Sequence, residues 1–187
     1  MNATIDLGHA ALAAAATVHP ELPGDIRSDH AGETGAVMIY RGILAGSRDP
    51  EVRAFACTHL KTEQQHLGIL EEILPPDQRS LLLPVWRIAG WLTGFLPALA
   101  GARAVYATID AVETFVDHHY EAQILKLPAT GPAGSLRSVL IACQADEVHH
   151  RDEARERRTD ANGVALRLWT KLVKFGSESA VAAARRL

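Results

Sequence analysis

The pattern of apolar and polar residues along the chain predicts six helices. Apolar side chains recur every three or four positions over long stretches, as they do on helices that bury one face. Asp49 followed by Pro50 is typical of a helix start, and Pro75 with Pro76 cannot continue the helix before them. The same signals predict helices over residues 26–44, 50–74, 85–96, 98–127, 135–159 and 164–187.

Two of these helix boundaries depend on single residues. We expect Pro97 to interrupt the apolar helix that contains it, because proline lacks a backbone N–H. We expect Ser135 to cap the fifth helix. The Ala-rich residues 1–24 are predicted to be a flexible lead-in, and residues 25–187 to form a single domain.

Residues 81–109 are the most apolar part of the chain. Their longest uncharged run, residues 88–102, has 15 residues and contains Pro97, whereas a membrane-spanning helix needs about 20 apolar residues. We therefore expect this segment to lie in one leaflet of a membrane or to form a buried hairpin. Gly90 and Gly94 have the spacing that lets two helices approach closely.

Composition favours a helical protein that does not bind nucleic acid. Apolar residues make up 48% of the chain and aromatic residues only 5%, which favours helices packed on helices over a β-sandwich. The formal net charge of −3 gives no general attraction to nucleic acid. From Arg151 onward nine Lys and Arg face five Asp and Glu. That basic end either lies against an anionic membrane or is solvated.

The expected location is the cytoplasmic side of the cell membrane. Cys57 and Cys143 are too few to form a disulfide framework, so nothing in the sequence requires an oxidising compartment. The first Lys or Arg is Arg27, so the amino terminus lacks the positive charge that opens a secretory signal.

Four of the predicted helices carry a repeated pattern of Glu and His. Glu33 is followed 30 residues later by Glu63-x-x-His66, and Glu113 is followed 34 residues later by Glu147-x-x-His150. Residues three apart share one face of a helix, so each Glu-x-x-His offers a carboxylate and an imidazole to the same point. Two helices with one Glu and two with Glu-x-x-His make the ligand set of ferritin-like di-iron bundles.

The pattern therefore predicts an all-α fold, a ferritin-like four-helix bundle with a di-iron core, to which an apolar helical hairpin and a C-terminal helix are added. Four carboxylates in a helical core repel one another, and two divalent cations neutralise them. Mixed carboxylate and imidazole ligands suit iron or manganese better than zinc. We expect Glu63 and Glu147 to bridge the two ions, and Glu33 and Glu113 to be terminal ligands.

Several polar residues are expected to surround these ligands. Asp146 either accepts a hydrogen bond from the far nitrogen of His66, which would fix its tautomer, or is solvated. Asp29 and His30 precede Glu33 by four and three residues. These two residues, and His59 before the second Glu, are either outer partners of the ligands or spare ligands, and we favour outer partners.

The chain resembles the demethoxyubiquinone hydroxylases of ubiquinone biosynthesis, a family of ferritin-like di-iron monooxygenases. The resemblance covers about residues 26–187 and rests on DHAGETGA (29–36), EQQHL (63–67), VE (112–113), HY (119–120) and DEVHH (146–150). The DHAGE start and the His119-Tyr120 pair are more specific than the ligand pattern, which ferritins, rubrerythrins, manganese catalases and a tRNA hydroxylase share. Thr34 departs from the pattern, since an aromatic residue is expected after the first Glu.

The resemblance implies an enzyme that binds two iron ions and inserts one oxygen atom of dioxygen into the ring of a polyprenylated methoxybenzoquinol. It further implies peripheral membrane binding and a reductant such as NADH, acting directly or through a reductase. A homo-oligomer or a biosynthetic complex is compatible with it. His119 and Tyr120 fall on a pair implicated in substrate or electron handling.

Two other functions fit the ligand pattern. One is another ferritin-like di-iron oxygenase, for example an enzyme that acts on tRNA, and the other is an iron-storage or peroxide-scavenging protein. The apolar segment 81–109 favours a substrate with a lipid tail, because an RNA backbone requires a basic groove.

Overall fold

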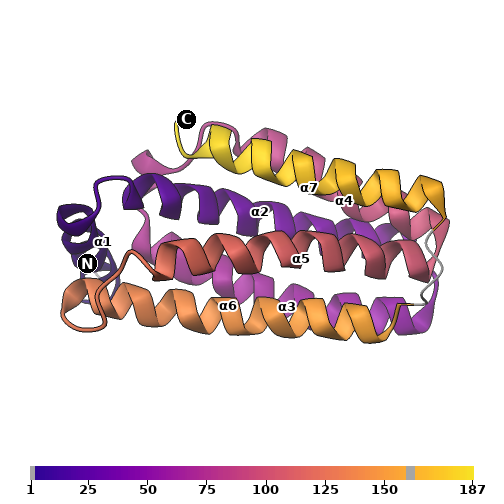
Figure 1. Cartoon of the computed structure of the whole chain (residues 1–187), viewed down its shortest axis with the longest axis horizontal. Helices are drawn as coiled ribbons and strands as arrows, with labels where there is room; N and C mark the ends of the chain where they lie inside the picture. The colour runs from indigo at the N-terminus through magenta and orange to yellow at the C-terminus, as the bar shows by residue number, and fades with distance from the viewer. Residues whose placement is uncertain (1–2, 159–162) are drawn as a thin grey trace.

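The protein is a bundle of α-helices, as the sequence predicted (Figure 1). The computed structural model describes residues 3–158 and 163–187, and contains no strand in those ranges. Four helices form the central bundle: α2 (Leu22–Gly46), α3 (Pro50–Ile73), α5 (Ala102–Ile124) and α6 (Pro132–Glu156). The others are α1 (Ala3–Val18), α4 (Leu83–Ala100), α7 (Val164–Ala184) and the short 3-10 helix Pro76–Gln78. The predicted ferritin-like architecture, including the C-terminal helix, is confirmed.

One predicted helix start is confirmed and another is wrong. The Asp49 carboxylate accepts hydrogen bonds from the backbone N–H groups of Glu51 and Val52, at 2.8 and 3.3 Å, so it caps α3 as expected. Helix α6 begins at Pro132, before Ser135, whose hydroxyl instead donates to the Pro132 carbonyl. The turn into α6 is made by Gly131, whose φ of 80° suits glycine.

The predicted interruption at Pro97 is also wrong. Helix α4 continues through Pro97 to Ala100, and the chain turns at Gly101, where φ is 101°. Pro97 lies in the last turn of α4, so the missing N–H weakens only the end of the helix. The conformation at Gly101 is one that residues with a side chain rarely adopt, so the break lies there.

Helix α4 packs closely along α2. A side chain on Gly90 would collide with the backbone of Gly35, and one on Gly94 with the carbonyl oxygen of Ile39. The spacing of the two glycines therefore has the packing role expected from the sequence. In the described part of the chain, no helix is both long and apolar enough to cross a membrane.

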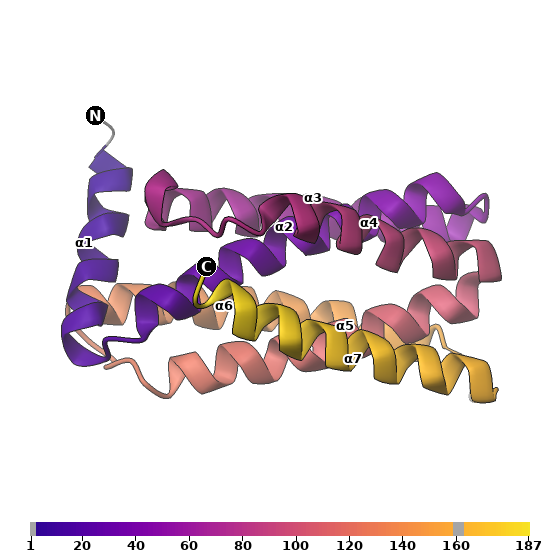
Figure 2. The same ribbon diagram turned by 90° about the horizontal axis from the view of Figure 1, so that it is seen from above.

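The lead-in is helical where we expected a flexible segment. Helix α1 lies across one end of the bundle (Figure 2). Its Ala11, Leu12 and Ala15 are buried in an apolar cluster with residues of α3 and α6. Small alanine side chains let α1 approach these helices, and the same Ala-rich composition favours a helix.

The core consists of two large apolar clusters with the predicted ligands between them. One cluster contains Tyr120, Ile124 and Leu136, together with the buried face of α1. The other contains Tyr40 and Phe55, together with apolar residues of α5. The bundle thus surrounds a polar centre with well-packed apolar layers on either side.

Candidate metal centre

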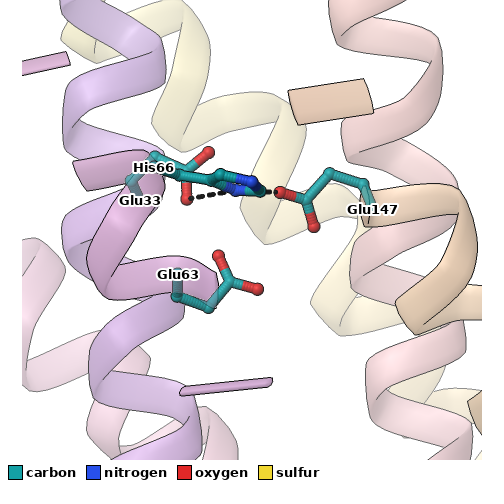
Figure 3. Close-up of side chains that lie close together, drawn as sticks. All are labelled: Glu33, Glu63, His66 and Glu147. Carbon is teal, nitrogen blue, oxygen red and sulfur yellow. Dashed lines mark hydrogen bonds and ion pairs between the residues drawn. The ribbon is translucent and has the colours of Figure 1, made fainter. Parts of the chain in front are cut away.

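The bundle brings all six predicted ligands together. Each lies inside one of the four central helices, and each is at most 4% exposed. Figure 3 shows His66 between the carboxylates of Glu33 and Glu147, with Glu63 beside them. The six residues are Glu33 on α2, Glu63 and His66 on α3, Glu113 on α5, and Glu147 and His150 on α6.

The ligand atoms form two groups that share two carboxylates. In each group the atoms lie within 4.8 Å of one another. The first group is Glu33, Glu63, His66 and Glu147, and the second is Glu63, Glu113, Glu147 and His150. Since Glu63 and Glu147 belong to both groups, they are placed where bridging ligands of a metal pair would be.

Both histidines turn the same ring nitrogen toward the carboxylates. The Nδ1 atom of His66 lies 2.9 Å from Glu147 Oε1 and 3.9 Å from Glu33 Oε2. The Nδ1 atom of His150 lies 3.0 Å from Glu63 Oε1 and 3.2 Å from Glu147 Oε2. The internal repeat of the sequence is therefore repeated in the geometry of the site.

The side chains of this centre fit a pair of cations. One oxygen of Glu33, both oxygens of Glu63, one oxygen of Glu147 and Nδ1 of His150 are buried and have no hydrogen-bond partner among the described residues. Buried polar atoms of this kind are costly unless they bind something. Carboxylate oxygens and imidazole nitrogens together suit divalent iron or manganese.

The pKa values of the four glutamates also indicate a site suited to cations. Burial, together with the charge of Glu147, raises the pKa of Glu33 to about 7. Burial and the neighbouring carboxylates also raise the pKa values of Glu63 and Glu113 well above the usual range. Burial opposes ionisation of Glu147 as well, but the neighbouring imidazoles of His150 and His66 lower its pKa to about 2. Without metal, the site holds protons where cations would otherwise neutralise the carboxylates.

Two buried tyrosines extend the repeat. The Tyr120 hydroxyl donates to Glu33 Oε1 at 2.6 Å, and the Tyr40 hydroxyl donates to Glu113 Oε1 at 3.4 Å. Each tyrosine lies seven residues after one terminal Glu and bonds to the terminal Glu of the other half. Tyr40 was not predicted from the sequence, although the repeated Glu-x6-Tyr spacing points to it.

The histidine ligands have different outer partners. The Nε2 atom of His66 lies 3.1 Å from Asp146 Oδ2, so of the two alternatives for Asp146 the hydrogen bond is the one found. His59 lies beside His150, with ring centroids 4.1 Å apart, and its Nε2 lies 2.8 Å from Glu153 Oε2. Glu153 was not singled out from the sequence, and no spacing in the repeat indicated it.

Asp29 and His30 have separate surroundings. The Asp29 carboxylate pairs with His119 Nε2 at 2.8 Å and accepts from the Gln123 amide at 2.7 Å. Asp29 therefore supports His119 and, among the described residues, bonds to none of the predicted ligands, so the role expected for it as their outer partner is not found. His30 is buried 3.9 Å from Glu71, and its ring nitrogens have no hydrogen-bond partner among the described residues.

A cavity of about 570 Å³ adjoins the carboxylate side of the centre, between α2, α4, α5 and α7. The four glutamates line it, but neither His66 nor His150 does. His119 and Tyr120 line the same cavity, close to Ser28 and Asp29. Most of the remaining wall is apolar and includes Trp86, Phe115, Val116, Leu172 and Val173. An apolar molecule in this cavity would meet the carboxylates of the centre.

Comparison with known proteins agrees with this geometry. The chain matches the family model of the ubiquinone biosynthesis protein COQ7 over residues 21–184. It is 34% identical over 151 residues to a 3-demethoxyubiquinol 3-hydroxylase of Rhodospirillum rubrum, covering 73% of this chain and 69% of that protein.

A similar relation holds for a eukaryotic relative. The chain is 32% identical over 164 residues to a mitochondrial NADPH-dependent 3-demethoxyubiquinone 3-hydroxylase of Dictyostelium discoideum, covering 83% of this chain and 73% of that protein. The family match spans all four helices that carry the Glu and His residues. The chain belongs to the family of the ubiquinone biosynthesis protein COQ7.

Proposed function

We propose that this protein is a dioxygen-dependent monooxygenase that hydroxylates the ring of a polyprenylated methoxybenzoquinol in ubiquinone biosynthesis. One oxygen atom of dioxygen enters the ring, and two electrons and two protons reduce the other to water. The observation that carries the proposal is the largely apolar cavity that reaches the buried carboxylates of the centre. The relatives named 3-demethoxyubiquinol 3-hydroxylase support the choice of substrate.

We assign two iron ions to the six buried Glu and His residues. Glu63 and Glu147 would bridge the ions, since each belongs to both groups of ligand atoms. Glu33 and His66 would complete one position, and Glu113 and His150 the other. Two reduced iron ions bound there would supply the activation of dioxygen, and the apolar clusters around the six residues would limit the access of bulk water.

The polar residues at the inner end of the cavity would orient the ring. The Nε2 atom of His119 lies 2.8 Å from Asp29 Oδ1 and 3.2 Å from Ser28 Oγ, so both partners hold the same edge of the imidazole. The Tyr120 hydroxyl holds the Glu33 carboxylate through its 2.6 Å hydrogen bond. His119 would then position a ring oxygen of the quinol, while Tyr120 holds a metal ligand beside it.

The outer part of the cavity suits a lipid tail. Helices α4 and α7 lie on the same side of the central bundle (Figures 1 and 2). Both helices expose large apolar residues, of which Val85 and Leu172 also line the cavity. The exposed set is Val85, Ile88, Leu92, Leu96 and Leu99 on α4, and Leu168, Leu172 and Phe175 on α7. We call this set the apolar face.

The apolar face would lie on a membrane surface, with the substrate tail passing between the protein and the lipid. Exposed Lys171 and Lys174 on α7 would favour anionic lipid. Peripheral attachment to the cytoplasmic side of the cell membrane is part of this proposal.

The electrons would come from a reduced nicotinamide nucleotide, directly or through a reductase. The name of the Dictyostelium relative specifies NADPH, and other relatives are named without a donor. The largely apolar wall of the cavity favours a quinol over tRNA, which would require basic residues around the site.

Isotope labelling tests the proposal directly. The protein is loaded with ferrous iron without oxygen, supplied with a short-chain demethoxyubiquinol in lipid vesicles, and exposed to ¹⁸O₂ with a reductant. Mass spectrometry should find one ¹⁸O atom in the new ring hydroxyl. Product that carries oxygen from water, or an iron-loaded protein that yields no hydroxylated quinol, would contradict the proposal.

A further inference from the structure

We propose that the two metal positions are unequal, and that the position formed by Glu33 and His66 binds metal more tightly and fills first. This inference rests on the proposed metal pair and adds the order in which its two positions fill. The two halves of the site carry the same ligands at similar spacings. The difference lies in the residues that hold those ligands.

The first difference concerns the histidines. Asp146 Oδ2 lies 3.1 Å from Nε2 of His66, while Nδ1 of the same ring points at the carboxylates. A carboxylate on the far nitrogen fixes the tautomer that leaves Nδ1 free to bind metal, and it makes the ring a better electron donor. Removing such a partner typically weakens metal binding about 10–100-fold.

His150 has no such partner in the described part of the chain. Asp146 directly precedes Glu147, and the corresponding residue before Glu63 is Thr62, which has no carboxylate. The neighbour of His150 is His59, which contacts it ring to ring at 4.1 Å with the planes 63° apart. That geometry is an edge contact between rings, and the carboxylate of Glu153 pairs with His59 instead.

The second difference concerns the terminal carboxylates. Tyr120 holds Glu33 through a hydrogen bond of 2.6 Å, whereas Tyr40 reaches Glu113 at only 3.4 Å. A donor–acceptor distance of 3.4 Å is longer than a normal hydrogen bond of this type. Both of the stronger outer contacts therefore belong to the same metal position, the one with Glu33 and His66.

The inequality has a consequence for how the enzyme is loaded. The Glu33–His66 position is held in the geometry of the bound state before metal arrives, so less ordering is needed when a metal binds there. The His150 position fills second and loses its metal first. Hydroxylation should therefore follow the second equivalent of iron, with little activity at one equivalent.

The test is a cobalt(II) titration of the whole chain without oxygen, followed by the visible absorption of the bound metal. The natural chain should bind in two steps whose dissociation constants differ at least about tenfold. Asp146→Asn, which keeps the shape but loses the charge, should weaken the first step about 10–100-fold. Asp152→Asn, an exposed residue on the same helix, serves as the matched control and should change neither step.

Two further variants assign the steps to positions. His150→Ala should leave the tight step and remove the weak one, whereas His66→Ala should remove the tight step. Thr62→Asp places a carboxylate at the equivalent point of the other half and should strengthen the second step. Circular dichroism of each variant checks that the helices are intact.

The outcomes separate this inference from the proposed function. A natural chain that fails to bind two metals would overturn the metal pair, and the inference with it. Two equal steps, or a first step that Asp146→Asn does not weaken, would overturn the inference and leave the metal pair standing. A second step unchanged by Thr62→Asp would show that the missing carboxylate is not the cause of the inequality.

Discussion

The ligand centre and the apolar face place opposite kinds of side chains in unfavourable surroundings. In the centre, four carboxylates are buried at 0–4% exposure, and four of their eight oxygens have no hydrogen-bond partner among the described residues. On α4 and α7, large apolar residues such as Ile88 and Phe175 are more than 60% exposed. Buried charges and exposed apolar patches each cost stability in an isolated chain.

The comparison shows that the buried carboxylates and the exposed apolar face both border the same cavity. The four carboxylates line its inner end, and Val85 and Leu172 of the apolar face line its wall. A metal pair would satisfy the first region and a lipid surface the second. Residues that break the ordinary rules of burial gather around this one cavity, and such a cluster indicates a functional site.

The largest effect should come from a bridging ligand. Replacing Glu147 with alanine removes oxygens that belong to both groups of ligand atoms, so we expect both irons to be lost. Hydroxylation should then fall to background. Iron per chain after anaerobic loading is the measurement, and Glu156→Ala at the exposed end of α6 is the control. Retention of both irons by Glu147→Ala would refute the assignment of this residue as a bridge.

A pH series on the metal-free chain tests the buried carboxylates. The pKa of Glu33 is raised from 4.5 to about 7, so between these values only the folded chain keeps the proton. Its contribution to the free energy of unfolding is complete below about pH 4.5 and is lost as the pH rises to about 7. The loss is on the order of 3 kcal/mol. The lowered pKa of Glu147, about 2, acts in a separate window below pH 4.5.

Chemical denaturation from pH 5 to pH 8 measures this change. The metal-free chain should lose stability across that range, and the raised pKa of His66, about 9, should extend the loss upward. Metal-loaded protein should show a much flatter profile, because cations then neutralise the carboxylates. Equal profiles with and without metal would mean that the metal binds elsewhere.

The apolar face can be altered without touching the centre. Changing Ile88, Leu92 and Leu96 to glutamine removes a stripe of exposed apolar residues from α4. Binding to anionic vesicles should weaken about 100-fold, because each side chain would otherwise contribute on the order of 1 kcal/mol by insertion. Iron content should not change. Leu125→Gln, 78% exposed at the end of α5, is the matched control.

Sedimentation with anionic vesicles measures the binding of each variant. If the triple variant binds as tightly as the natural chain, the exposed stripe on α4 has no part in membrane attachment. The structure sharpens the choice of residues here, since Trp91 and Phe95 are partly covered and stack on each other. Only the outward residues of α4 therefore make a clean test.

The sequence predicted the centre better than it predicted its surroundings. Ligand positions follow from helical spacing, because Glu63 and His66 must share a face once α3 is a helix. Helix ends were less certain: Pro97 is tolerated in a last turn, and Gly101 ends α4 through its φ, which the apolar pattern does not reveal. The Ala-rich composition of α1 already favoured a helix, but its packing on α3 and α6 is a tertiary effect that local signals do not show.

The outer partners of the ligands were predicted only in part. The contact between Asp146 and His66 was one of two alternatives for the residue that precedes Glu147, and it is the one found. Glu153 was missed, because its contact with His59 joins α6 to α3 across 94 residues. Contacts of this kind depend on the crossing of helices, which one sequence does not specify.

The pair His119 and Tyr120 connects the two regions. His119→Ala and Tyr120→Phe should each keep both irons and slow hydroxylation about tenfold or more. The first variant loses the imidazole that positions the quinol ring, and the second loses the hydrogen bond that holds Glu33. The defect should be larger with a quinone-like electron mediator than with a small reductant. His118→Ala, the exposed neighbour, is the control. Normal turnover by both variants would leave the pair with a structural role only.

The smallest effect should come from Tyr40, the counterpart of Tyr120 in the other half. Its hydroxyl lies 3.4 Å from Glu113 Oε1, so Tyr40→Phe removes a weak contact and should slow turnover only a few-fold. Tyr106→Phe is the matched control, because this third tyrosine is also buried but packs against Phe55, away from the carboxylates.

Mössbauer spectra of the iron-loaded variants provide a second measurement. Tyr120→Phe should change the signal of one iron strongly, and Tyr40→Phe should change that of the other iron slightly. An effect of Tyr40→Phe as large as that of Tyr120→Phe would mean that the two halves of the centre are held equally, contrary to the contacts in the structure.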